Sequence, residues 1–118
     1  ETIWELLELG AFFSINGGQL KPNARRIHDL IRLVPENRLL IETDAPDFLP
    51  PKAQQAFHLR TERDKHEPSL NHPANLKTGY QDIAEARGCP VEELAKIVEA
   101  NFTRYFFGAQ PNSDFRRP

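Results

Sequence analysis

Two acidic side chains mark the stretch of this sequence best suited to chemistry, Glu-Thr-Asp-Ala-Pro at residues 42–46. Because side chains alternate along a strand, Glu42 and Asp44 share one side, opposite Ile41 and Thr43. An acid pair on the inner face of an otherwise apolar strand is costly unless a partner or a metal compensates for it. Asp44 also ends its strand, and in parallel sheets ligands bind just beyond the carboxyl ends of strands. Asp44 is therefore a candidate to hold a divalent cation or to orient an attacking water.

A purely structural interpretation of the same acids stays open. In that interpretation Asp44 caps the turn before Pro46, and Glu42 is one member of a buried ion pair. Periodicity alone favours this second interpretation.

The acids need a parallel sheet to position them, and the hydrophobic periodicity predicts one. A helix is expected over Thr2–Leu9, and Gly10 suits its left-handed carboxyl end. An alternating strand over Ala11–Asn16, a helix over Pro22–Val34 and a short strand over Arg38–Asp44 then form a βαβ unit, whose crossover should be right-handed. The nearly continuous apolar run of the second strand indicates that it is buried on both faces.

The segment Ala45–Pro73 that follows is rich in proline and has little periodicity. It is longer than most connections in compact domains, and it lies where an active-site loop would lie. Helices over Asn75–Arg87 and Pro90–Phe107 come next, and residues 109–118 are predicted to form a flexible tail. Residues 1–108 are thus the expected structural unit.

Length and composition limit the classes of protein to consider. The chain has 118 residues, too few for a complete (β/α)₈ barrel of about 250 residues. A net charge of −2 argues against a nucleic-acid binder that relies on bulk positive charge. No apolar run approaches the roughly 20 residues of a membrane span. The single Cys89 favours a reducing compartment, the cytoplasm or alternatively the nucleus. The chain starts at Glu1 and has no methionine, which predicts a fragment.

Four segments carry a recognisable pattern: Ala-Phe-Phe-Ser-Ile-Asn-Gly at 11–17, Arg-Leu-Leu-Ile-Glu-Thr-Asp-Ala-Pro at 38–46, Asn-His-Pro-Ala-Asn-Leu at 71–76, and Asn101-Phe102 with Tyr105-Phe106. In order and spacing they resemble the carboxyl-terminal part of the TatD-type metal-dependent hydrolases. The match runs from Glu1 to about Gly108. The Glu-Thr-Asp-Ala-Pro segment is fairly specific when Asn-x-Pro follows it, although each piece alone would be weak.

The resemblance implies an amidohydrolase-like TIM barrel, of which this α/β chain would be the C-terminal section, about the last two β/α units plus closing helices. Phe12–Asn16 would be the seventh strand and Arg38–Asp44 the eighth. Asp44 would then help to hold a divalent ion, magnesium with zinc or manganese as alternatives, and to activate the water. Asn71 would hold the long loop or the turn at Asp44, and Glu42 would act structurally or behind the metal site. Members of the family are best known as deoxyribonucleases that cleave phosphodiesters.

Most of the metal ligands that the resemblance implies have no counterpart in this sequence. The family's His-x-His pair, a mid-barrel Glu and two later histidines are missing, so the chain alone is expected to be inactive. His58, His66 and His72, with Asp64 and Glu67, fit no common zinc spacing, and we interpret them as solvated loop residues.

The aromatic cluster of the last helix comprises Phe102, Tyr105, Phe106 and Phe107. Since three of these residues share the apolar stripe of the helix, we interpret them as core filling rather than as a platform for nucleobases.

The leading hypothesis is the C-terminal section of a metal-dependent phosphodiesterase whose substrate is DNA. One alternative is a non-catalytic truncated relative that serves as a binding or assembly module. Another is a hydrolase of amide or ester bonds, because a fold and one aspartate do not determine the substrate. Open sheet edges predict association with a missing N-terminal barrel portion or with further copies of the chain, and no membrane partner is expected.

Overall fold

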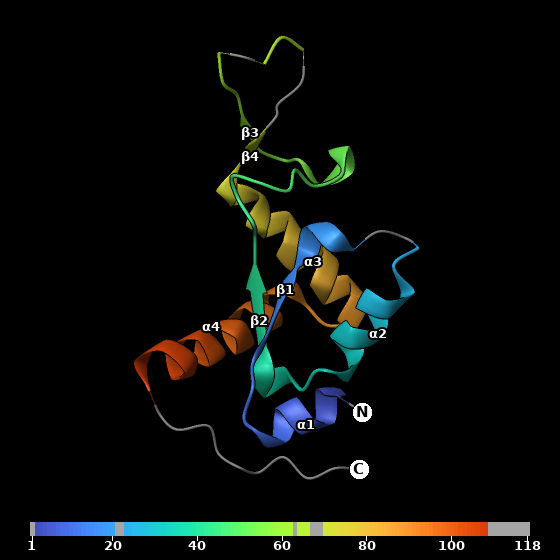
Figure 1. The fold of residues 1–118 in the computed structure, drawn as a ribbon, viewed down its shortest axis with the longest axis vertical. Coiled ribbons are helices and arrows are strands. Elements are labelled where there is room, and N and C mark those ends of the chain that lie inside the picture. The colour runs from blue at the N-terminus through green and yellow to red at the C-terminus, as the bar shows by residue number, and fades with distance from the viewer. Residues whose placement is uncertain (1, 21–22, 63, 67–69, 109–118) are drawn as a thin grey trace.

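The computed structural model describes residues 2–20, 23–62, 64–66 and 70–108. Short 3₁₀ turns, η1 (Gly17–Gln19), η2 (Glu36–Arg38), η3 (Lys52–Gln54) and η4 (Pro73–Asn75), connect the longer elements. The helices and strands follow in the order α1 (Thr2–Glu8), β1 (Phe13–Asn16), α2 (Arg25–Leu33), β2 (Leu39–Glu42), β3 (His58–Leu59), β4 (Leu70–Asn71), α3 (Leu76–Arg87) and α4 (Val91–Phe107) (Figure 1).

The predicted strand–helix–strand unit is confirmed. β1 and β2 pair in parallel, with Phe13 opposite Leu39 and Asn16 opposite Glu42, and α2 lies between them in the chain. Helix α2 begins at Arg25, later than predicted, and the predicted start at Pro22 lies outside the described residues. The predicted helix ends are confirmed where the backbone turns left-handed, at Gly10 (φ 80°) and Gly88 (φ 70°).

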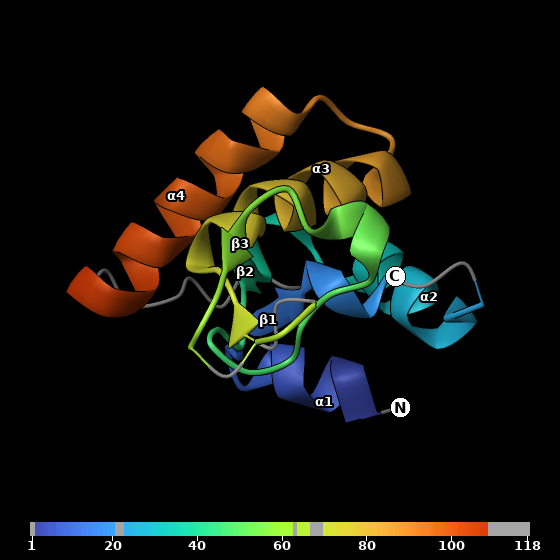
Figure 2. The same cartoon turned by 90° about the horizontal axis from the view of Figure 1, so that it is seen from above.

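The core lies against one face of the two strands. Ile15 of β1 and Leu39 of β2 are buried there, and Phe13 and Ile41 pack beside them. Figure 2 shows α3 and α4 together on one side of the strands. The remaining members of this core come from the helices and the turns beside them: Leu20, Ile31, Val34, Ile83, Ala84, Leu94 and Val98.

The prediction that the second strand is buried on both faces is wrong. Residues of β2 alternate between the core side, where Leu39 is 0% exposed, and an open side on which Glu42 is exposed. In a sheet whose second face is uncovered, acidic side chains can stay in water and avoid the cost of desolvation. Glu42 and Asp44 therefore do not form the buried acid pair that the apolar run suggested.

The long segment after β2 is more ordered than its composition predicts. β3 and β4 pair antiparallel, His58 opposite Asn71 and Leu59 opposite Leu70, so the segment returns on itself. Figure 1 shows it projecting past the carboxyl ends of β1 and β2. The predicted flexible tail at 109–118 lies outside the described residues.

The interpretation of the α4 aromatic cluster as core filling is also wrong. Phe102, Tyr105, Phe106 and Phe107 are all exposed, Phe107 to 77%. Three of them, all but Phe107, line a groove of about 610 Å³ whose walls also include Phe12, Leu40 and Glu42.

The strand order places β1 on one edge of β2, and no strand of the described residues pairs with the other edge. The same apolar stripe of α4 includes Leu94 and Val98, which are buried in the core. The described residues therefore leave only its carboxyl-terminal, aromatic half exposed.

Candidate active site

Two side-chain hydrogen bonds join the paired strands on their open face. Ser14 Oγ donates to Glu42 Oε2 over 2.9 Å, and Asn16 Nδ2 donates to Asp44 Oδ2 over 2.7 Å. Because the strands are parallel, their carboxyl ends meet at one edge, and the second bond lies there. The edge predicted to bind ligands thus carries Asn16 and Asp44 in direct contact.

The two acids differ in their surroundings. Glu42 is exposed and its partner is a neutral hydroxyl, so the alternative that it belongs to a buried ion pair is wrong. Asp44 is half-buried. The turn after the strand is capped by Thr43, whose Oγ1 accepts from the Ala45 N–H at 3.3 Å. The capping function that we considered for Asp44 is therefore supplied by its neighbour.

Asn16 is a site residue that sequence reasoning missed. Its side chain is buried, with 8% exposed, and its Oδ1 accepts from the Gly18 N–H at 2.9 Å. Strand alternation puts Asn16 on the same side of β1 as Ser14. The strand register that brings Asn16 to Asp44, however, is set by the tertiary structure.

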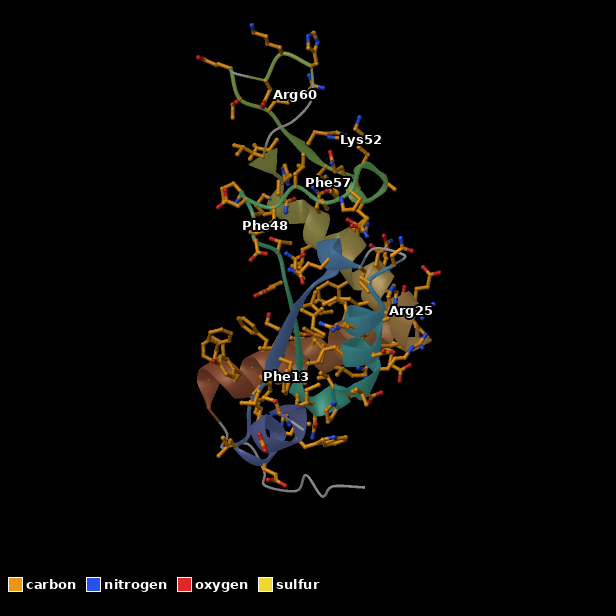
Figure 3. The ribbon with its side chains drawn as sticks, turned by 45° about the vertical axis from the view of Figure 1, so that its right-hand side comes forward. Phe13, Arg25, Phe48, Lys52, Phe57 and Arg60 are labelled. Atoms are coloured by element: carbon orange, nitrogen blue, oxygen red, sulfur yellow. The ribbon has the colours of Figure 1, made fainter. Side chains whose placement is uncertain are left out.

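Asn71 lies between the long loop and the turn that follows Asp44. Its backbone N–H donates to the Pro46 carbonyl at 2.8 Å, and its Nδ2 donates to the Phe48 carbonyl at 3.3 Å. Phe48 has φ 49°, a conformation that bulky residues rarely adopt. Figure 3 shows Phe48 beyond the carboxyl end of the strands, where the loop leaves them, and Phe13 near their amino end. These contacts are those required of a residue that holds the loop to the Asp44 turn.

Asn75 is a second anchor that the sequence did not reveal. Its Oδ1 accepts from the Phe57 N–H at 2.9 Å, and its Nδ2 donates to the Phe57 carbonyl at 3.1 Å and to Asn71 Oδ1 at 3.1 Å. Nearby, His72 Nδ1 accepts from the Ala74 N–H at 3.0 Å and so caps η4. Two side chains of the segment at 71–76, Asn71 and Asn75, thus bind the backbone of the long loop.

The amino-terminal end of β2 is held by a separate polar cluster. Asn101, 1% exposed, donates through Nδ2 to the carbonyls of Glu36 and Leu39 at 2.6 and 2.8 Å. Arg38 lies 5.1 Å from the centre of the Phe12 ring. Burial, and secondly the charge of Arg104, lower the pKa of Arg38 below its ordinary value. Asn101 was part of the family pattern, but its task of holding β2 becomes visible only in three dimensions.

A divalent cation is implied by the family resemblance, and Asp44 suits it in part. Its Oδ1 receives no hydrogen bond from the residues described, and carboxylate oxygens are the ligands that Mg²⁺ prefers. Among those same residues, no three of the His, Cys, Asp and Glu side chains gather into a metal-binding group. Glu67, of the rejected zinc set, lies outside the described residues, and His58 and His66 are exposed. Asp44 thus fits a metal site as one ligand, not as a whole site.

Comparison with known proteins identifies relatives along nearly the whole chain. The family model for TatD related DNase matches residues 1–107. The uncharacterized metal-dependent hydrolase YcfH of Escherichia coli K12 is 35% identical over 106 residues, which cover 90% of this chain and 35% of YcfH. The 3′-5′ ssDNA/RNA exonuclease TatD of Citrobacter rodentium is 34% identical over 107 residues, which cover 90% of this chain and 37% of that protein.

Solved structures of the same family share the fold. A hydrolase of the TatD family from Entamoeba histolytica superposes with a TM-score of 0.68 at 19% identity, over 91% of this chain and 38% of that one. The TatD homologue YJJV from Escherichia coli K12 gives 0.67 at 24% identity, over 90% and 36%. The chain spans little more than a third of the length of the curated relatives it matches. None of the described helices combines the length and apolar composition of a membrane span. Since the family model covers residues 1–107, the chain belongs to the TatD-related DNase family.

Proposed function

We propose that this chain contributes the metal-binding aspartate of a hydrolase that cleaves phosphodiester bonds in nucleic acid, with DNA as the substrate and magnesium as the ion. The observation that carries the proposal is the position of Asp44. Asp44 follows the carboxyl end of a parallel strand. Its Oδ2 accepts a hydrogen bond from Asn16, and its Oδ1 accepts none from the residues that the structure describes. Two relatives, one named a metal-dependent hydrolase and the other a 3′-5′ ssDNA/RNA exonuclease, support this reaction class.

In this proposal the residues of the chain orient and support the reacting groups. A divalent cation supplies Lewis acidity toward the phosphoryl group and makes water a better nucleophile. Asp44 contributes a negative charge at a fixed place. Asn71 holds the loop that follows Asp44, through the carbonyls of Pro46 and Phe48. Further ligands are required, because one carboxylate binds a divalent ion feebly.

We also propose that β1 and β2 are the last two strands of a (β/α)₈ barrel. The support is the edge of β2 with which no described strand pairs, together with the apolar groove beside it, which includes Phe102 and Phe106. A further strand paired with that edge would extend the sheet and bury the exposed aromatic rings. The open face that carries Ser14 and Glu42 would then face the barrel interior.

The test is Asp44→Asn in the full-length gene product. Magnesium-dependent release of nucleotides from single-stranded DNA should fall by orders of magnitude, while the circular-dichroism spectrum stays unchanged. The matched control is Asp47→Asn, which removes the same charge from an exposed side chain three residues away and should leave turnover within about twofold. Near-normal activity of the Asp44 variant would refute the assignment. Activity of the parent protein on amide or carboxylic ester substrates, with none on DNA, would leave the assignment of Asp44 in place but overturn the proposal that DNA is the substrate.

A further inference from the structure

We propose that Asn16 is a positioning residue that orients the Asp44 carboxylate and determines which of its oxygens faces the cation. The inference rests on the proposed function and deepens it, since it assigns a task to a residue that does not touch the metal. It starts from the 2.7 Å bond between Asn16 Nδ2 and Asp44 Oδ2.

Asp44 needs such a partner because the sheet does not hold it. Strand β2 ends at Glu42, whose backbone is in register with Asn16, and Asp44 lies two residues further along. A carboxylate beyond the last paired residue has rotational freedom that ladder hydrogen bonds cannot remove. A side-chain bond from the neighbouring strand removes it.

The Asn16 amide can present only one end to Asp44. Its Oδ1 accepts from the Gly18 N–H at 2.9 Å, and a backbone N–H can bond only to the oxygen of the amide. Rotating the amide by half a turn would set its NH₂ against that N–H and its oxygen against the carboxylate, so that both bonds would be lost. The NH₂ group is therefore fixed toward Asp44.

The backbone that carries Asn16 is equally constrained. Gly17 packs so closely on α3 that a Cβ there would lie 2.3 Å from the Gly79 Cα. Asn16 itself is 8% exposed and is paired with β2. Because β1 is packed tightly on α3, Asn16 holds the Asp44 carboxylate at a fixed place relative to both elements.

The result is a carboxylate with two distinct oxygens. Oδ2 is occupied by the amide, and Oδ1 is left free by the described residues, so Asp44 would bind a cation through one oxygen. The bond from Ser14 to Glu42 also crosses between the two strands, but it holds an exposed carboxylate within β2 and not the one beyond its end. Ser14 is therefore a matched control.

The experiment measures Mn²⁺ binding to the full-length gene product by calorimetry and by the Mn²⁺ electron paramagnetic resonance spectrum. Asn16→Ala should weaken binding by about 10- to 100-fold and alter the spectrum of the bound ion. Ser14→Ala should leave affinity within about twofold. Because the loss acts through Asp44, adding Asn16→Ala to Asp44→Asn should weaken binding no further. Asn16→Leu, which keeps the branched shape but forms neither bond, serves if the alanine variant fails to fold.

The outcomes separate this inference from the proposed function. If Asp44→Asn weakens Mn²⁺ binding and both Asn16 variants bind like the parent, the positioning task is refuted and the metal assignment remains. If the Asn16 and Asp44 effects add in the double variant, Asn16 does not act through Asp44. If Asp44→Asn binds Mn²⁺ normally, the metal assignment and this inference are overturned together.

Discussion

At the contact between Gly17 and Gly79, substitution of each glycine by alanine should have opposite effects on the free energy of unfolding. A Cβ on Gly17 would lie 2.3 Å from the Gly79 Cα and 2.9 Å from its C and O atoms. All three are backbone atoms that cannot rotate away, so β1 and α3 would have to separate. Such overpacking costs typically up to about 3 kcal/mol, and we expect Gly17→Ala to reach that value or exceed it.

Gly79→Ala should do the reverse. Its Cβ would meet Gly17 Cα at 3.5 Å and Gly17 N at 3.7 Å, which are ordinary contacts. Gly79 lies inside α3, where alanine is favoured over glycine by about 1 kcal/mol. We therefore expect a gain of up to about 1 kcal/mol, or a rise in Tm of about 3 °C in the full-length gene product.

Urea unfolding followed by circular dichroism measures both variants. The midpoints should move in opposite directions while the m-value stays constant. The reasoning would be refuted by a Gly17→Ala midpoint equal to that of the parent. It would also be refuted if the two substitutions destabilised the protein equally.

Two further predictions concern charge and assembly. Burial, and secondly the charge of Glu85, raise the pKa of Asp82 above its ordinary value of 3.8, although the hydrogen bond from Gln54 opposes this shift. The folded state therefore loses stability as the pH rises from 3.8 through the higher pKa of folded Asp82. Asp82→Asn should therefore gain stability over the parent with rising pH above about 4, and a difference in Tm that is constant with pH would contradict this. The 118-residue chain alone should self-associate in analytical ultracentrifugation, and Phe106→Glu should weaken that association; a cooperatively folded monomer would contradict the incomplete-barrel proposal.

Local patterns predicted most of the elements that carry the site. The helix ends at Gly10 and Gly88 depend on a backbone conformation that glycine adopts without strain, so neighbouring residues were enough to predict them. Glu42 and Asp44 were placed on one side by strand alternation, and the parallel pairing followed from a strand–helix–strand spacing. These features arise from interactions within a few residues.

The errors came from judging what covers a surface. Phe102 and Phe106 share an apolar helix stripe, and Leu39–Glu42 forms an apolar strand, so both were expected to be enclosed. Periodicity shows which side chains lie together, but burial depends on a second element, which can be distant in the sequence. The structure packs one face of the strands and leaves the aromatic groove exposed.

By itself, the sequence determined the long helices, the two parallel strands, the side of the strand that carries the acids, and the family pattern around Asp44. Only the tertiary structure decided the partner of Asp44, the anchoring of the loop by Asn75, and the close approach of Gly17 to α3. The physical reason is the range of the interactions. Helix periodicity and turn conformation are set over a few bonds, whereas a hydrogen bond across two strands depends on the register in which distant segments meet.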